Sequence, residues 1–256
     1  MTHEFLDVDV LESFPMDEFL AQRPFPWWSI EAALRPEKFA ELHAAYPSLD
    51  LFDWHESRDR AYGQRPHNRY YTAYRNPLYS PYEGHVKEDF PEVWQRFLTE
   101  LETSDDYQRF LVRVAGHPDL NLRYTFHVAK TGSEVSPHLD KPRKVSTHIF
   151  YFNTVDDWDP AWGGATIVLD GKRSDNPAPD YSDFTDARRV DNLGNRSFIF
   201  RNTEDAWHGV PPMVCPEGHY RRLFNVVAER PDEEMRARSA GSRKGLRSRI
   251  RALVSH

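Results

Sequence analysis

The hydrophobic periodicity of this chain changes once, at about Gly116. Before that point, apolar residues recur three and four positions apart at 34–46 and 89–114, which predicts amphipathic helices. After it, short β-branched and aromatic runs bounded by Gly, Pro, Asn and Asp predict strands at 120–128, 145–153, 165–169, 197–201 and 223–228. Helices followed by strands indicate a mixed α+β, mainly β fold: a helical layer that supports one antiparallel sandwich or barrel, not a βαβ fold.

Two long segments interrupt this pattern. Residues 61–82 are rich in Arg, Tyr, Asn and Pro, and residues 171–189 are polar, so both are predicted to be loops. From residue 231 the chain becomes helical and basic again. We therefore expect a single domain over 1–256, with helical support at 1–116, a β core at 117–230 and a basic C-terminal helical tail at 231–256.

Composition excludes several classes of protein. Hydrophobic residues make up 39% and charged residues 29% of the chain, which is typical of a globular protein. A net charge of −7 argues against general nucleic-acid binding, which requires a basic surface. The single cysteine, Cys215, excludes an intrachain disulfide and fits a reducing compartment. No signal peptide and no apolar run long enough to span a bilayer are found, so we expect a cytoplasmic protein without a transmembrane segment.

A metal site is indicated by His138 and Asp140, which stand two residues apart in Ser-Pro-His-Leu-Asp. Residues at this spacing on an extended strand point to the same side. His208, just after the predicted strand at 197–201, is the candidate third ligand. Two imidazoles and one carboxylate leave about three positions open on an octahedral Fe(II), enough for a bidentate co-substrate and O₂. Alone, an HxD pair also arises by chance in a chain with 12 histidines.

Arg221 is the candidate anchor for such a co-substrate. It follows His208 at the beginning of a predicted strand. The far carboxylate of a dicarboxylate is well held by a guanidinium, because bidentate pairing sets both charge and orientation. Arg222 is the adjacent alternative and should face the opposite side of the strand. An ordinary solvated charge at a strand end is the other interpretation of Arg221.

Taken in order, five motifs resemble the prolyl-hydroxylase-type branch of the Fe(II)/2-oxoglutarate-dependent dioxygenase superfamily: PHLD (137–140), STHIFYFN (146–153), WDPAWGG (158–164), NRSFIF (195–200) and WHGVP (207–211). The resemblance covers about 120–228 and, weakly, 24–49. It implies a double-stranded β-helix (jelly-roll, cupin-like) core, with His138, Asp140 and His208 as metal ligands and Arg221 as the 2-oxoglutarate anchor.

The resemblance also suggests residues around the co-substrate. Tyr151 lies where relatives often place a tyrosine that binds the distal carboxylate, although a core aromatic is an equal alternative. Thr147 and His148 precede it, and one of the two should point into the barrel. Leu223 departs from the pattern, because many relatives have serine two residues after the anchoring arginine.

The resemblance implies an oxygenase with Fe(II), 2-oxoglutarate and O₂ that releases succinate and CO₂. Asp140 favours hydroxylation, or a desaturating or cyclising variant, over halogenation. The composition of the 65–75 segment suits a small polar or carrier-tethered metabolite, as in natural product biosynthesis, although simple packing is the alternative. The candidate substrate residues are Arg65, Arg69, Tyr71, Arg143 and Trp207.

Three other classes of protein share parts of this pattern. A zinc hydrolase would share His and Asp ligands, but the HxH and HExxH spacings are missing. A hydroxylase of a protein or peptide side chain, and a jelly-roll protein that binds without turnover, are further alternatives. The basic segment 236–251 is a candidate docking site for an acidic partner, such as a carrier protein, or for a membrane surface; a solvated helix is the plainer interpretation.

Overall fold

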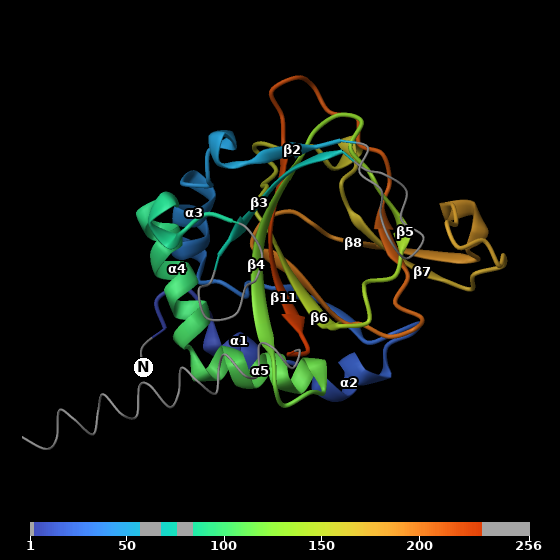
Figure 1. The fold of residues 1–256 in the computed structure, drawn as a ribbon, viewed down its shortest axis with the longest axis horizontal. Helices are drawn as coiled ribbons and strands as arrows, with labels where there is room; N and C mark the ends of the chain where they lie inside the picture. The colour runs from blue at the N-terminus through green and yellow to red at the C-terminus, as the bar shows by residue number, and fades with distance from the viewer. Residues whose placement is uncertain (1–2, 57–67, 76–83, 232–256) are drawn as a thin grey trace, which may run out of the picture.

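Strands dominate the computed structural model, which describes residues 3–56, 68–75 and 84–231 (Figure 1). The helices are α1 (Val8–Glu12), α2 (Met16–Ala21), α3 (Pro36–Ala44), α4 (Glu92–Thr103) and α5 (Asp105–Ala115). The strands are β1 (Trp27–Glu31), β2 (Asp53–His55), β3 (Arg69–Tyr74), β4 (Asn121–Ala129), β5 (Val135–His138), β6 (Lys144–Tyr151), β7 (Thr166–Asp170), β8 (Asp186–Val190), β9 (Arg196–Arg201), β10 (His208–Val210) and β11 (Arg221–Glu229). Short 3₁₀ turns lie at Leu49–Leu51, Lys87–Asp89, Pro160–Trp162 and Tyr181–Asp183.

The strands form two antiparallel sheets. The larger has the order β1-β9-β6-β11-β4-β3-β2, and the smaller has the order β5-β10-β7-β8. The sheets lie on opposite sides of the barrel interior in Figure 1. This mixed α+β arrangement is consistent with the expected double-stranded β-helix core.

The helices cover the outer face of the larger sheet. Trp94 and Phe97 on α4 pack against aromatic rings of three adjacent strands, with the Trp94 ring centroid 4.9 Å from that of Phe126 and 5.5 Å from that of Phe224. The Phe97 centroid lies 6.0 Å from that of Phe150. These rings occupy alternate strand positions, so the intervening residues of β4, β6 and β11 face the barrel interior. The helical layer thus fixes which side chains point inward.

One helical region of the sequence prediction is two helices in the structure. The predicted region 89–114 is interrupted at Ser104, whose hydroxyl accepts a hydrogen bond from the Tyr107 amide at 3.1 Å and caps α5. α5 ends at Gly116, which has a φ of 66° and is in the left-handed conformation that glycine adopts without a steric cost.

Both predicted loops contain a strand, and the loop prediction was wrong there. β3 lies within 61–82, and β8 begins within 171–189. The inward side of β3 carries Arg69 and Tyr71, so the alternation of apolar and polar residues that marks a strand is hidden. β8 is an edge strand with four exposed residues in succession and gives no apolar pattern. The predicted C-terminal helix falls on residues outside the described part of the chain, apart from residue 231.

Over the described residues, no helix is long and apolar enough to cross a membrane.

A buried histidine between the sheet and α5 gives a testable pH dependence of stability. His148 is fully buried, with Nδ1 3.0 Å from the Tyr107 hydroxyl and Nε2 2.9 Å from the Ser197 hydroxyl. Burial lowers the pKa of His148 to about 3. Below about pH 6.5 the unfolded chain therefore binds a proton at His148 that the folded chain does not bind. The free energy of unfolding then falls by up to about 1.4 kcal/mol for each unit by which the pH is lowered.

We expect a His148→Gln variant to lose stability less steeply than the wild type between about pH 6.5 and 4. Urea unfolding at several pH values measures this difference. His117→Gln, in the partly exposed turn after α5, is the control and should keep the wild-type slope. Equal slopes for His148→Gln and the wild type would show that His148 does not remain neutral in the folded protein.

Candidate active site

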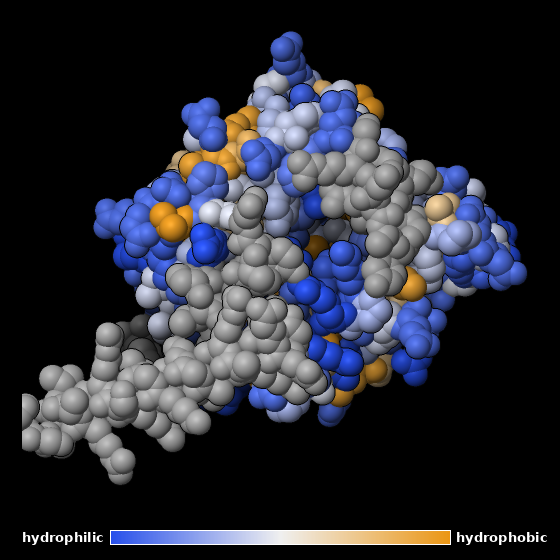
Figure 2. Space-filling view, in the orientation of Figure 1, coloured by the Kyte–Doolittle hydropathy of each residue, from blue (hydrophilic) through white to orange (hydrophobic). Residues whose placement is uncertain are grey.

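The barrel interior contains a cavity of about 450 Å³ between the two sheets. Its walls are the inward positions of β4, β6 and β11 on one side, and residues of β5 and β10 on the other. Figure 2 shows this face of the molecule hollowed near its centre, with hydrophilic side chains at the edge of the hollow. A cavity of this size is typical of a small-molecule site.

His138 and His208 are neighbours across the smaller sheet. β5 and β10 pair antiparallel with these two residues directly opposite each other, and their ring centroids are 4.3 Å apart. Each Nδ1 lies near a backbone carbonyl, that of Ser136 at 3.0 Å and that of Ala206 at 2.9 Å. Because a carbonyl only accepts, Nδ1 carries the proton in both rings, and each Nε2 keeps a lone pair.

Burial keeps both imidazoles neutral. His138 is 7% exposed and His208 is 8% exposed. Burial lowers the pKa of His138 well below its ordinary value, and the neighbouring His208 lowers it further. The pKa of His208 is also lowered by burial, against the opposing effect of Asp140. Two neutral rings with available lone pairs are the form in which histidine binds a metal.

Asp140 borders the same cavity, two residues beyond His138. Its carboxylate accepts a short hydrogen bond from Lys144 and a longer one of 3.4 Å from the Thr147 hydroxyl. Burial opposes ionisation of Asp140, but the Lys144 charge and the two histidines hold its pKa below the ordinary value. In this arrangement no three His, Cys, Asp or Glu side chains of the described residues gather closely enough to hold a metal, because the carboxylate is turned toward Lys144.

Arg221 is a buried cation without a hydrogen-bond partner at Nε. It is 5% exposed, and its Nε contacts no acceptor among the described residues. Its guanidinium lies 5.6 Å from the centroid of the Tyr151 ring. Gly164, at a φ of 86°, makes room for it, since a Cβ there would lie 2.9 Å from the Arg221 Cδ. An unpaired buried donor indicates a place where an acceptor binds.

Arg222 points to the other side of β11. Its Nη1 lies 3.3 Å from an Asp157 carboxylate oxygen, and its guanidinium lies 5.9 Å from the ring of Tyr46 in the helical layer. The alternation of side chains along a strand accounts for this difference. The structure therefore places Arg221, and not Arg222, on the cavity.

The residues of β6 divide in the same way. Thr147 lines the cavity, whereas His148 lies on the helical side. The Tyr151 and Thr166 hydroxyls form a hydrogen bond of 2.8 Å, and the Arg221 guanidinium lies over the Tyr151 ring. Leu223, on the inward side of β11, also lines the cavity.

The candidate substrate residues are not all brought together. Arg69, Tyr71 and Arg143 line the cavity. Trp207 does not; its ring packs 5.6 Å from that of Phe184, with Lys172 over it. Arg65 lies outside the described residues.

Sequence reasoning missed several cavity residues, namely His55, Arg123, Asn225 and Glu229. The signal for two of them was the alternation along β11, which puts Asn225 and Glu229 on the same side as Arg221. Arg123 sits likewise on the inward side of β4. Strand parity alone, counted from Arg221, would have identified the two residues of β11.

Residues 123–226, which run from β4 to most of β11 and include β5, β6 and β10, match the family model of the 2OG-Fe(II) oxygenase superfamily. Over these residues the chain carries a 2OG-Fe(II) oxygenase core. It is therefore an enzyme of the 2-oxoglutarate oxygenase type, and the family uses Fe(II) and 2-oxoglutarate. No curated protein matches the sequence.

Solved structures share the fold of this 2OG-Fe(II) oxygenase at low sequence identity. A Pseudomonas putida prolyl 4-hydroxylase is 13% identical, with a TM-score of 0.51 over 88% of this chain and 99% of that one. A non-heme α-ketoglutarate-dependent carbocyclase from nogalamycin biosynthesis is 13% identical, with a TM-score of 0.56 over 87% of each chain. An epimerase from the same biosynthesis is 14% identical, with a TM-score of 0.53 over 84% and 82%.

The cavity residues of this chain suit both groups chemically. Two neutral imidazoles and one carboxylate are a donor set typical of non-heme Fe(II). The unpaired Nε of buried Arg221 suits a carboxylate of 2-oxoglutarate.

Proposed function

We propose that this oxygenase binds Fe(II) through His138, Asp140 and His208 and anchors 2-oxoglutarate through Arg221. The reaction is hydroxylation of an unactivated C–H bond in a small polar metabolite, or its desaturating or cyclising variant. One observation carries the proposal: the cross-strand histidine pair and the unpaired buried guanidinium border the same cavity.

The protein's own residues position and shield the reaction. When bound, Fe(II), 2-oxoglutarate and O₂ supply the oxidation of the C–H bond, with release of succinate and CO₂. The two histidines present Nε2 lone pairs because their Nδ1 protons are held by backbone carbonyls. Metal binding requires the Asp140 carboxylate to turn from Lys144 toward the histidines, while Thr147 stays within its reach.

Arg221 and Tyr151 act at the far end of the co-substrate. The Arg221 guanidinium binds the distal carboxylate, and the Tyr151 ring lies against that guanidinium and sets its orientation. Tyr151 remains a neutral donor, because burial raises the pKa of its hydroxyl. Thr166 and Leu223 close the wall around this pair and exclude water.

The cavity favours a small metabolite over a peptide substrate. Its volume of about 450 Å³ has to accommodate 2-oxoglutarate as well as the reacting group. The structural neighbours include prolyl hydroxylases and enzymes of nogalamycin biosynthesis, so their names do not favour one substrate class. A carrier tether would dock through the basic C-terminal segment, which lies outside the described residues.

Anaerobic addition of Fe(II) and 2-oxoglutarate is expected to produce a weak visible charge-transfer band that saturates at one iron per chain. The physical reason is chelation of the metal by the 2-oxo acid end of the co-substrate. Succinate, which has no 2-oxo group, is the control ligand and should give no band. A folded sample that binds neither iron nor 2-oxoglutarate would contradict the proposal.

A further inference from the structure

The inward face of β11 carries an asparagine whose side-chain oxygen has no hydrogen-bond donor. Asn225 is 9% exposed and lines the cavity, and its Oδ1 has no partner among the described residues. We infer that Asn225 binds the substrate, through a hydrogen bond that Oδ1 accepts from a substrate hydroxyl or N–H group. This inference deepens the proposed function and rests on it, because it concerns the substrate of the same active site.

The two strands beside Asn225 do not supply this donor. In the register of the larger sheet, Asn225 lies opposite Thr125 on β4 and opposite Ile149 on β6. The Thr125 Oγ1 is hydrogen-bonded to the His127 Nε2 at 3.2 Å, and the Ile149 side chain is apolar. Within the described part of the chain, Oδ1 is therefore left unpaired. Buried polar atoms in folded proteins are paired as a rule, so an unpaired one on a cavity wall indicates where a ligand supplies the partner.

The co-substrate and the metal cannot supply the donor either. The 2-oxoglutarate dianion has two carboxylates and a ketone, and oxygens of these kinds only accept hydrogen bonds. Fe(II) has no proton to donate. The donor for Asn225 therefore has to belong to another molecule in the cavity, and the substrate is the molecule that the proposed reaction brings there.

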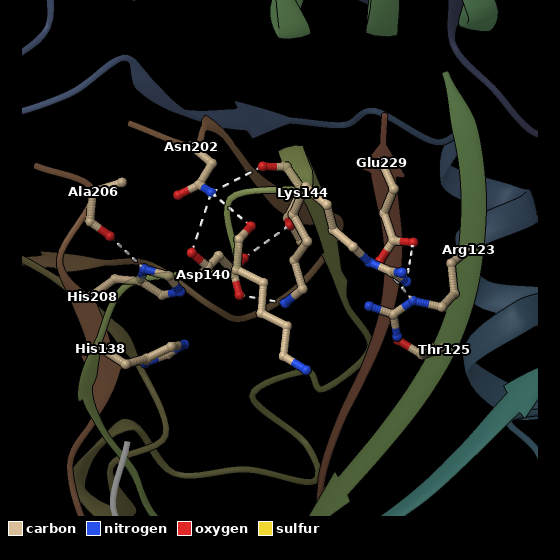
Figure 3. A network of polar contacts seen from close by, with 12 residues as sticks. Arg123, Thr125, His138, Asp140, Lys144, Asn202, Ala206, His208 and Glu229 are labelled. Atoms are coloured by element: carbon tan, nitrogen blue, oxygen red, sulfur yellow. Dashed lines mark hydrogen bonds and ion pairs between the residues drawn. The ribbon is translucent and has the colours of Figure 1, made fainter. Parts of the chain in front are cut away.

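Asn225 is separate from the co-substrate anchor. It stands four residues from Arg221 on β11, which is about 13 Å along an extended strand. Figure 3 shows Thr125, the cross-strand partner of Asn225, on the wall across from His138 and His208. Asn225 thus belongs to the middle of the wall that faces the histidine pair.

The position of Asn225 relative to Asp140 gives the hydrogen bond a role in orientation. Thr147 on β6 is the diagonal neighbour of Asn225, at roughly 7–8 Å in an antiparallel sheet. The Thr147 hydroxyl lies 3.4 Å from an Asp140 carboxylate oxygen. A substrate group bound to Asn225 is therefore held close to the proposed metal site, where its orientation determines which C–H bond is presented. Analogues without the donor would leave Oδ1 unpaired and bind less tightly.

The test uses the protein loaded with Fe(II) and 2-oxoglutarate under argon, so that no turnover occurs. The probes are two matched pairs, cyclohexanol with methoxycyclohexane and pyrrolidinone with N-methylpyrrolidinone, and only the first compound of each pair has a donor. Ligand-observed NMR titration measures the affinity of each probe. We expect the donor-bearing compound of at least one pair to bind about 2- to 10-fold more tightly, as one neutral hydrogen bond provides. Preference in the alcohol pair alone indicates a substrate hydroxyl, and preference in the lactam pair alone indicates an N–H group.

Two substitutions at Asn225 distinguish the hydrogen bond from simple packing. Asn225→Leu keeps a similar volume without an acceptor, so the preference should disappear. Asn225→Asp keeps an acceptor, so the preference should remain. Asn192→Leu is the matched control and should behave as the wild type does, because Asn192 is 3% exposed and has an unpaired Nδ2 but does not line the cavity.

The stability of Asn225→Leu provides a second measurement. Since the substitution removes a buried acceptor that has no donor, the variant should be at least as resistant to urea as the wild type. A marked loss of stability would show that Oδ1 is paired within the folded protein, and the inference would be wrong.

The charge-transfer band separates this inference from the proposed function. If no probe binds, if neither pair shows a preference, or if the preference survives in Asn225→Leu or is lost in Asn225→Asp, the inference is wrong while the proposed function stands. Loss of the band in Asn225→Leu would assign Asn225 to the co-substrate site and would also overturn the inference. A missing band in the wild type would instead contradict the proposed function.

Discussion

Replacing Arg221 with methionine is expected to weaken 2-oxoglutarate binding by about 2–5 kcal/mol, or roughly 30- to 5000-fold, because a buried charge pair loses its cation. Methionine keeps most of the aliphatic packing beside Gly164. Iron binding should be little affected, since Arg221 contacts neither histidine. Titration of the charge-transfer band with 2-oxoglutarate, at saturating Fe(II), measures the change.

The stability of the same variant provides an independent check. In the free protein, the Arg221 Nε is buried without an acceptor, which costs free energy of folding. Arg221→Met should therefore be at least as stable as the wild type while it binds 2-oxoglutarate poorly. Arg222→Met is the matched control, because it removes the same charge from the opposite side of β11. If Arg222→Met had the larger effect on 2-oxoglutarate binding, the anchor would have to be reassigned.

Replacing Asp140 with alanine is expected to lower Fe(II) affinity by more than about 100-fold, beyond the 10- to 100-fold typical of residues that only support a ligand. The variant loses the one carboxylate of the proposed ligand set and leaves the Lys144 ammonium facing the site. Repulsion between that ammonium and Fe(II) adds to the loss. Anaerobic competition with a chelator measures iron affinity, and succinate release should fall below detection.

Asp140→Gly tests the chemistry further. It opens a position on the metal, so hydroxylation should be abolished and chloride should gain access to the site. Asp186→Ala, on the exposed strand β8, is the control for loss of a carboxylate. Hydroxylation at the wild-type rate in Asp140→Gly would show that Asp140 is not a ligand.

Much of the fold can be predicted from hydrophobic periodicity, because the periodicity of a helix or strand depends on which of its own faces is buried. The helical spacing of apolar residues located α3, α4 and α5, and alternation located five of the central strands. The HxD spacing predicted that His138 and Asp140 lie on one extended strand; β5 ends at His138, and Asp140 lies two residues beyond it. These features are local, since each depends on which face of its own helix or strand meets the core.

Strands with polar or exposed faces were missed for the same reason. β3 presents Arg69 and Tyr71 to the cavity, and β8 is exposed at the sheet edge. Neither has the apolar alternation that periodicity detects. Polar residues on the inward faces of β3, β4 and β11 weaken the apolar alternation. The same faces line the cavity.

By itself, the sequence determined the main helices, five of the strands, the candidate metal-binding residues and the parity that separates Arg221 from Arg222. Only the tertiary structure decided that β10 lies beside β5, which sets His208 opposite His138, and that Glu229 gathers Arg123 and Arg143 at the other end of β11. The physical reason is that side-chain parity is a property of one strand, whereas neighbours in a sheet are set by hydrogen-bond pairing between segments distant along the chain.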